Sequence, residues 1–226
     1  MYPVIFALSA YRPHHGRMSE GTVSSSWRRI DDWLAAHAPA ALAMLNPPVT
    51  AEALESAQHV LGIRLPDELK ESLKCHDGLS GWSSLLPESA PLSASGIAEH
   101  WQICMETAAD NDGFVVPPWD DEPWWHPLWI PWAESADGKA HIIDLRPGPD
   151  HGRLGWAGHG GGGDFSDSWA SLASYLGDVS HALHFGGGVR GEFPYLTLDG
   201  QLWWDLGEDC RSLNGRPLIP APVGLR

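Results

Sequence analysis

The chain has 226 residues, 43% of them hydrophobic, which is enough to bury the core of one large domain. Its 29 Asp and Glu against 14 Lys and Arg give a net charge of -15, which argues against direct contact with nucleic-acid phosphates or an anionic membrane and favours a basic partner. Cys75, Cys104 and Cys210 lie too far apart to predict a disulfide framework or a zinc knuckle, so we expect reduced thiols in a cytoplasmic protein.

The first 26 residues are expected to form a disordered N-terminal extension. The apolar run at 4–10 follows no Lys or Arg and is far shorter than a membrane span, so it predicts neither a signal peptide nor a membrane helix. Whether Met1 or Met18 is the true start stays open. The preference for Ala, Gly, Pro and Arg over Lys is typical of a GC-rich bacterial genome.

Three helices are predicted to open the domain. Ser26 is the expected N-cap of the first, in which apolar residues recur at helical spacing before Pro39. Thr50 and Gly62 are typical of the two ends of a second helix. A third begins after Pro66 and stops before the glycine at position 78.

Short apolar runs after residue 81 predict strands, apart from a piece at 97–105 with an ambiguous helical pattern. The runs at 129–133 and 140–145 flank Asp137-Gly138, a tight-turn sequence, so they are expected to pair antiparallel, followed by a strand at 153–157.

A fourth helix is expected after Ser166, carrying an apolar stripe from Trp169 to Val179. A hairpin closing at Asp199-Gly200 should follow. The whole pattern predicts an α+β fold, with N-terminal helices packed on an antiparallel or mixed sheet, a late helix and a C-terminal hairpin. We expect a single domain over 27–211 and a loose tail over 212–226.

Four short motifs, in this order, resemble those of the SUKH superfamily, which includes Smi/Knr-type regulators of cell-wall assembly and bacterial immunity proteins. They are Leu65-Pro66-Asp67-Glu68-Leu69-Lys70 to His76-Asp77-Gly78, then Trp129-Ile130-Pro131-Trp132-Ala133, then Asp137-Gly138 to Ile143-Asp144-Leu145, and Asp167-Ser168-Trp169. The resemblance implies a SUKH-like fold whose structural motif residues are Leu65, Pro66, Gly78, Trp129, Pro131, Asp144 and Trp169. It also implies a non-catalytic, protein-binding role.

Patterns for catalysis or cofactor binding are weak. The glycine run at 158–163 formally fits G-x-G-x-x-G, but without an enclosing βαβ unit it is more typical of a flexible turn. Asp178, His181 and His184 share a helix face, which makes a metal-dependent enzyme the second alternative. The lack of a fourth ligand at a defined spacing argues against it. Cys75 is read as a core residue. We therefore expect no enzyme, no metal and no cofactor.

The middle of the chain is the best candidate for a contact surface. No Lys or Arg occurs between Lys74 and Lys139, whereas eleven Asp or Glu and seven Trp do. Within the segment 117–127, rigid prolines alternate with acids and aromatic rings, a mixture that suits charge steering and aromatic anchoring. The predicted partner-binding residues are Trp119, Asp120, Asp121, Glu122, Trp124 and Trp125. The alternative is that these rings cover the sheet and that the acids are merely solvated.

The function expected from these observations is that of an immunity protein that neutralises a basic toxin, such as a nuclease, by direct binding. The alternative is a regulatory adaptor in cell-wall or envelope assembly, with the same fold and a protein partner. Neither reading involves direct binding to nucleic acid or to a membrane. The sequence does not identify the partner or the oligomeric state.

Overall fold

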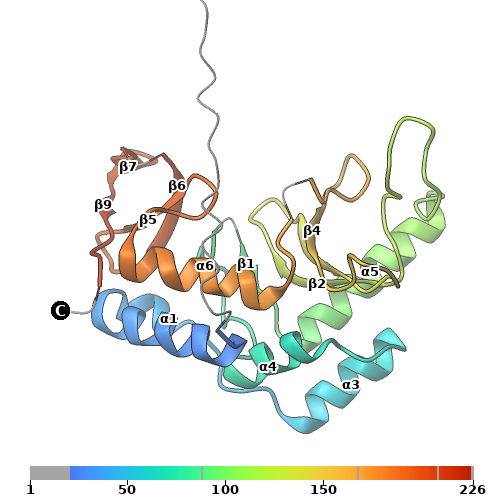
Figure 1. Cartoon of the computed structure of the whole chain (residues 1–226), viewed down its shortest axis with the longest axis horizontal. Helices are drawn as coiled ribbons and strands as arrows, with labels where there is room; N and C mark the ends of the chain where they lie inside the picture. The colour runs from blue at the N-terminus through green and yellow to red at the C-terminus, as the bar shows by residue number, and fades with distance from the viewer. Residues whose placement is uncertain (1–20, 88, 167, 208, 225–226) are drawn as a thin grey trace, which may run out of the picture.

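A computed structural model describes residues 21–87, 89–166, 168–207 and 209–224 (Figure 1). Of the N-terminal extension predicted for residues 1–26, residues 1–20 lie outside this part of the chain. Residues 23–26 instead form the first turn of a helix, so the extension was predicted to end too late. Within it, the helices are α1 Val23–His37, α2 Pro39–Leu42, α3 Ala51–Leu61, α4 Asp67–Cys75, α5 Ala94–Asp110 and α6 Leu172–Phe185. The strands are β1 Ala90–Pro91, β2 Trp129–Glu134, β3 Ala140–Asp144, β4 Leu154–Ala157, β5 Glu192–Leu196, β6 Leu202–Leu206, β7 Ser212–Leu213, β8 Arg216–Pro217 and β9 Ile219–Pro220.

The predicted α+β class is confirmed, with N-terminal helices, a central sheet, a late helix and C-terminal strands. The central sheet has the order β1-β2-β3-β4 and is antiparallel throughout. Its two faces are both buried: Trp129 and Ile142 face a small core beside α5, whereas Ile130 and Ile143 face the main core under α6. Burial on both faces explains why these strands are apolar runs without alternation.

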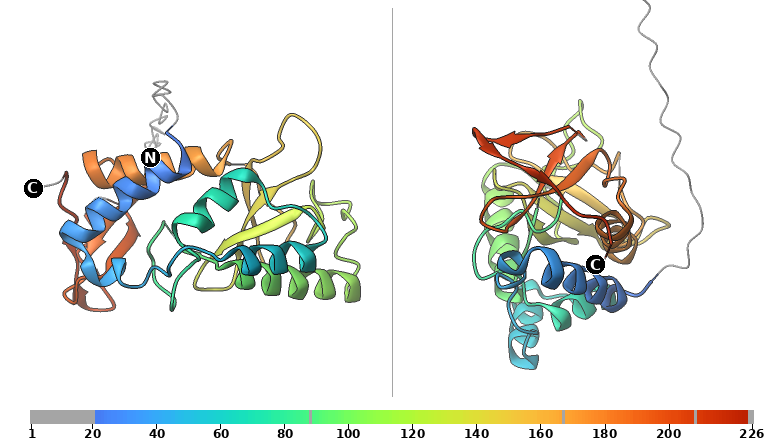
Figure 2. Two further views of the ribbon diagram at one scale, coloured as in Figure 1. Left: turned by 90° about the horizontal axis from the view of Figure 1, so that it is seen from below. Right: turned by 90° about the vertical axis from the view of Figure 1, so that its left-hand side faces the viewer.

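Helices α1 and α6 lie side by side across the molecule, as both views in Figure 2 show. The apolar stripe of α1 that the sequence predicts is fully buried, and the indole N–H of Trp27 donates to Ser72 of α4 over 2.8 Å. The helix begins earlier than predicted, because Thr22, not Ser26, is the N-cap and accepts from the backbone N–H of Ser25. The expected cap, Ser26, is buried inside the helix.

The caps of α3 are as predicted: Thr50 accepts from Ala53, and Gly62 adopts the left-handed conformation with φ 68°. The start of α6 was predicted wrongly at Ser166. The helix begins instead at Leu172, where Ser171 and Ser174 form a reciprocal capping box.

The predicted hairpin is confirmed, since β5 and β6 pair antiparallel and Gly200 in the turn has φ 79°. The segment predicted as a loose tail from 212 instead forms β7, β8 and β9. Strand β9 pairs with β5, and Leu218 before it is 7% exposed. The backbone carbonyl of Pro222 accepts from the indole of Trp33 on α1, so this segment is tied to the core.

Candidate protein-interaction site

The acidic loop, defined here as residues 114–124, connects the end of α5 to the approach to β2. Its base is closed by a backbone hydrogen bond of 3.0 Å from the N–H of Trp125 to the carbonyl of Gly113. The N–H of Gly113 donates in turn to Ala108 in the last turn of α5. In Figure 1 the loop is the green-yellow excursion that rises beyond the end of α5. The base of the loop is therefore closed and tied to the last turn of α5.

The two ends of the predicted contact segment differ in exposure. Trp119 is 84% exposed and Asp121 is also exposed, so both are available to a partner. Trp125, which the sequence placed in the contact surface, is only 1% exposed. Its ring packs edge-on against Trp129 at 6.0 Å between centroids. Trp125 therefore belongs to the small core and holds the base of the loop.

The half-buried Asp120 and Trp124 fasten the loop to the glycine run. Asp120 accepts from the backbone N–H of Gly162 over 2.9 Å, and this hydrogen bond lowers the pKa of its carboxyl group. The indole of Trp124 donates to the carbonyl of His159. A Cβ atom at Gly162 would collide with the carbonyl of Glu122. The glycine run connects β4 to α6 as a turn should, and at Gly162 its close packing against the loop requires glycine.

Glu122 is the member of the predicted contact set that is bound by cations of the chain itself. Its two carboxylate oxygens accept from Arg146 at 2.6 and 2.9 Å, and Arg153 lies at 3.5 Å. The side chain is 18% exposed. Its charge is therefore neutralised locally, and its role in the structure is to anchor the loop.

Asp144 at the end of β3 completes the ion-pair network. It contacts Arg146 at 2.7 Å and Arg153 at 3.2 Å, with its own side chain 3% exposed. Burial opposes its ionisation, but the hydrogen bonds from Arg146 and Arg153 prevail and its pKa is lowered. The same two carboxylates raise the pKa of Arg146, whose guanidinium lies 5.4 Å from the ring centre of Trp129. Two arginines thus join the loop to the sheet.

The apolar half of the acidic loop was missed by sequence reasoning, which began the contact segment at Pro117. Phe114, Val115 and Val116 are 39%, 65% and 47% exposed. The available signal was an apolar triplet directly before Pro117-Pro118, which ends regular structure. These three side chains and Trp119 are called the apolar limb of the loop; all four are exposed, and the limb directly precedes the acids in the sequence.

The remaining residues of the family motifs lie in the scaffold. Leu65 is buried, Pro66 occupies the N-cap position of α4, and Pro131 lies in β2 beside a register shift. Gly78 has φ 70°, and a Cβ atom there would collide with the backbone of Ser93. Asp77 accepts from the N–H of Ala94 over 2.7 Å, so this turn joins the end of α4 to the start of α5.

The residues proposed for a metal site make separate contacts. Asp178 accepts from the indole of Trp169 over 2.8 Å, and His184 contacts the carbonyl of Arg29. The ring of His181 packs against Phe185. Among the residues that the structure describes, no three His, Cys, Asp or Glu side chains are grouped to hold a metal ion.

Cys75, which the sequence predicts to be a core residue, is half-buried, and burial raises the pKa of its thiol. A raised pKa disfavours the reactive thiolate.

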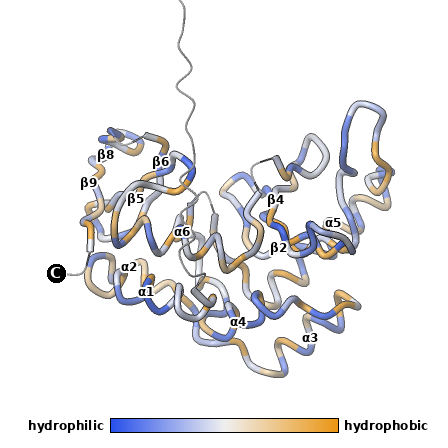
Figure 3. Tube along the Cα trace, viewed as in Figure 1, coloured by the Kyte–Doolittle hydropathy of each residue, from blue (hydrophilic) through white to orange (hydrophobic). Residues whose placement is uncertain are grey.

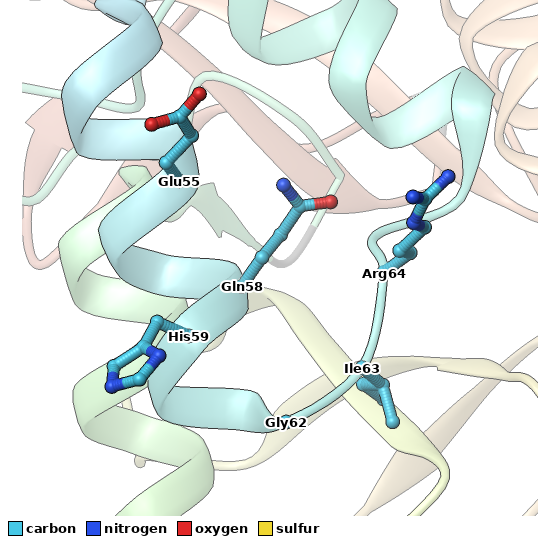
Figure 4. Close-up of a pocket in the computed structure, with 6 residues that line it drawn as sticks. All are labelled: Glu55, Gln58, His59, Gly62, Ile63 and Arg64. Carbon is cyan, nitrogen blue, oxygen red and sulfur yellow. The ribbon is translucent and has the colours of Figure 1, made fainter.

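A shallow depression at the end of α3 is shown in Figure 4. It encloses about 410 Å³ and is lined by Glu55, Gln58, His59, Gly62, Ile63 and Arg64. The side-chain oxygen of Gln58 accepts a hydrogen bond from the backbone N–H of Leu65. This hydrogen bond holds the turn between α3 and α4. His59 extends away from Gln58 and Arg64, so the polar groups do not converge on a common ligand.

Comparison with known proteins places this scaffold in a family. The profile of the SMI1/KNR4 family (SUKH-1) matches residues 48–178, so the chain belongs to that family and the predicted resemblance is confirmed. The matched region begins before α3 and ends within α6, and it includes the whole acidic loop.

Three fungal relatives match part of the chain at modest identity. A glucan synthesis regulatory protein of Neurospora crassa is 22% identical over 168 residues, which cover 56% of this chain and 32% of the relative. The cell wall assembly regulator SMI1 of Saccharomyces cerevisiae is 25% identical over 166 residues, which cover 55% of this chain and 33% of the relative. The cell wall biosynthesis/cell cycle regulator smi1 of Schizosaccharomyces pombe is 28% identical over 146 residues, which cover 56% of this chain and 29% of the relative. The matched region covers about a third of each relative. In the part of the chain that the structure describes, no helix is both long and apolar enough to cross a bilayer.

Proposed function

We propose that this chain is a regulatory adaptor for cell-wall or envelope assembly that acts by binding another protein. The observation that carries the proposal is that three relatives from different fungi are all named as regulators of glucan synthesis or of cell-wall assembly or biosynthesis. A regulator of this kind needs a partner surface and no reaction centre. The proposed surface is the acidic loop, on which Trp119 and Asp121 are exposed.

The immunity reading, which the sequence favoured, receives no support from the names of these relatives. It shares with the adaptor reading the need for a protein partner. The two readings differ in the identity of that partner: a wall-synthesis or signalling protein in one case, a toxin in the other.

Deletion of the gene in its host tests the adaptor reading. We expect the deletion strain to become sensitive to wall-binding dyes and to contain altered wall polymer, and we expect the wild-type gene to restore both properties. A deletion strain with normal wall composition and normal dye resistance would contradict the adaptor reading. If the strain instead died only when the product of an adjacent gene was expressed, the immunity reading would replace it.

A further inference from the structure

The apolar limb of the acidic loop carries large hydrophobic side chains that are exposed to solvent. Val115 and Trp119, at 65% and 84%, are among the most exposed large hydrophobic side chains of the described chain. The hydropathy colouring in Figure 3 shows hydrophobic and hydrophilic stretches following one another along this loop. Exposed apolar surface costs hydration free energy, and a contiguous patch bordered by polar groups is typical of an interaction site.

The limb is held in place although its side chains are exposed. One end is fixed where Trp125 donates to Gly113, and the other is fixed by the contacts of Asp120 and Glu122. A backbone hydrogen bond from Asp120 to Pro117 closes a turn between the apolar and the acidic halves. A surface that is already ordered loses little conformational entropy when a partner binds.

Uncompensated negative charge borders the limb. Asp110, Asp112 and Asp121 are exposed, and the ion pairs found among the described residues include none of them. Lys and Arg are absent from the sequence between residues 74 and 139. Of the three acids within the acidic loop, Glu122 is the one for which the described residues include ion pairs with Arg. The complementary ligand therefore carries positive charge.

We propose that the apolar limb is a docking site for a cationic segment of the partner protein, in which a large apolar side chain is flanked by Arg or Lys. The apolar side chain packs between Val115 and Trp119, and the cations pair with Asp112 and Asp121 or stack on the indole. This inference rests on the proposed function, because it defines the kind of partner segment that the adaptor recognises. In this arrangement the apolar limb supplies most of the binding contact, and the acids select segments that carry Arg or Lys.

Selection from a phage-displayed library of random peptides on the full chain provides the test. We expect the enriched peptides to combine Arg or Lys with Trp, Phe or Leu. Binding of a synthetic enriched peptide, measured by fluorescence anisotropy, should weaken at least about tenfold in Trp119→Ala, as is common for a central aromatic anchor. The matched control is Trp82→Ala, which removes an indole that is 46% exposed outside the loop and should leave the affinity unchanged.

Three outcomes would overturn the docking site: acidic or purely polar enriched peptides, equal affinity of both variants, or a concentration-dependent dimer that Trp119→Ala abolishes in analytical ultracentrifugation. The last would mean that a second copy of this chain covers the limb. The wall phenotype separates this failure from that of the adaptor reading. If peptide binding fails while the deletion strain still has a defective wall, only the docking site is wrong.

Discussion

Asp144 carries the negative charge at the centre of the network that joins the acidic loop to the sheet. Its side chain is 3% exposed and faces two partly exposed guanidinium groups, so loss of its charge leaves Arg146 with Glu122 as its remaining carboxylate and removes the nearest carboxylate of Arg153. We expect Asp144→Asn to lower the free energy of unfolding by about 2–4 kcal/mol in urea denaturation. Asp150→Asn is the control, because that carboxylate is 66% exposed and lies 3.7 Å from Arg153. Its cost should stay below about 0.5 kcal/mol, and equal effects would contradict the assigned role of Asp144.

Gly163 allows the glycine run to lie directly on the ring of Trp129. A Cβ atom there would collide with that ring, which is fully buried and cannot move aside. We expect Gly163→Ala to destabilise the chain by about 1–3 kcal/mol in thermal or urea unfolding. In the same run, Gly161 has no atom near its would-be Cβ. Gly161→Ala should therefore leave stability within about 0.5 kcal/mol of the parent, and the reverse order would disprove the packing argument.

His141 lies in β3 with its ring against Trp132 and Trp156, and its Nε2 atom has no hydrogen-bond partner among the described residues. Burial lowers its pKa well below the usual value of 6.5. Below pH 6.5 the unfolded chain binds a proton here that the folded chain does not bind, so stability falls as the pH falls from 6.5 toward the folded pKa, and this contribution is constant above 6.5.

The measurement is urea unfolding of the parent and of His141→Phe at pH values between about 7.5 and 5. We expect the parent to lose about 1–2 kcal/mol more than the variant over this interval, at no more than about 1.4 kcal/mol per pH unit. The comparison removes the contribution of His126, whose pKa is also lowered, first by burial and then by Arg146. Parallel pH curves for the two proteins would show that His141 is not the titrating group.

Composition identifies the acidic loop but does not assign its residues. Trp119 and Trp125 occur in the same segment with similar neighbours, yet one is exposed and the other buried. The difference arises because β2 brings Trp129 against Trp125, a contact that depends on the sheet and on no local pattern. Likewise, Glu122 is neutralised by arginines 24 and 31 residues away. Tertiary pairing of this kind has no local sequence signal.

At the scale of elements, turn and capping chemistry predicted α3, the strands β2 to β4 and the hairpin of β5 and β6, since each has its own local signals. Two helix starts were misplaced where several hydroxyl residues compete for the cap. Ser171 caps α6 in a reciprocal box with Ser174, and the ring of Trp169, which precedes the cap, lies 4.8 Å from that of Tyr175.

The C-terminal strands depend on β5 and α1, which explains why residues 212–226 resembled a loose tail in isolation. A chain ending at Leu218 would lose β9 and the hydrogen bonds that Trp33 and His37 make with Pro222 and Gly224. We expect this truncation to lower the melting temperature by several degrees, because in a domain of this size each kcal/mol of lost unfolding free energy lowers it by a few degrees.

Ile219→Ser is the control for the truncation, because the side chain of Ile219 is 48% exposed while its backbone pairing is kept. It should change the melting temperature by less than half as much as the truncation does. If the truncated chain melted at the parental temperature, the segment would be a tail after all, and its strand pairing would contribute nothing to stability.

At the scale of the whole molecule, the net charge of -15 is concentrated away from the few Lys and Arg residues. The acidic loop projects at one end, whereas α4 with Lys70 and Lys74 lies near the centre of the view in Figure 1. A uniform charge would attract a cationic ligand from all sides, whereas under the proposed docking site this distribution would direct the ligand to the loop. Steering of this kind acts on the association rate and is screened by salt.

Reversing one exposed charge at the loop tests this directional field. We expect Asp121→Lys to slow association of an enriched cationic peptide by about two- to tenfold at low ionic strength, with little change in the dissociation rate, in stopped-flow fluorescence. Asp67→Lys makes the same change of charge at an exposed position of α4 and should have a clearly smaller effect. The difference should vanish near 1 M salt, where the Debye length falls to about 3 Å. If both substitutions slowed association equally, net charge alone would govern capture, and the acidic loop would have no directing role.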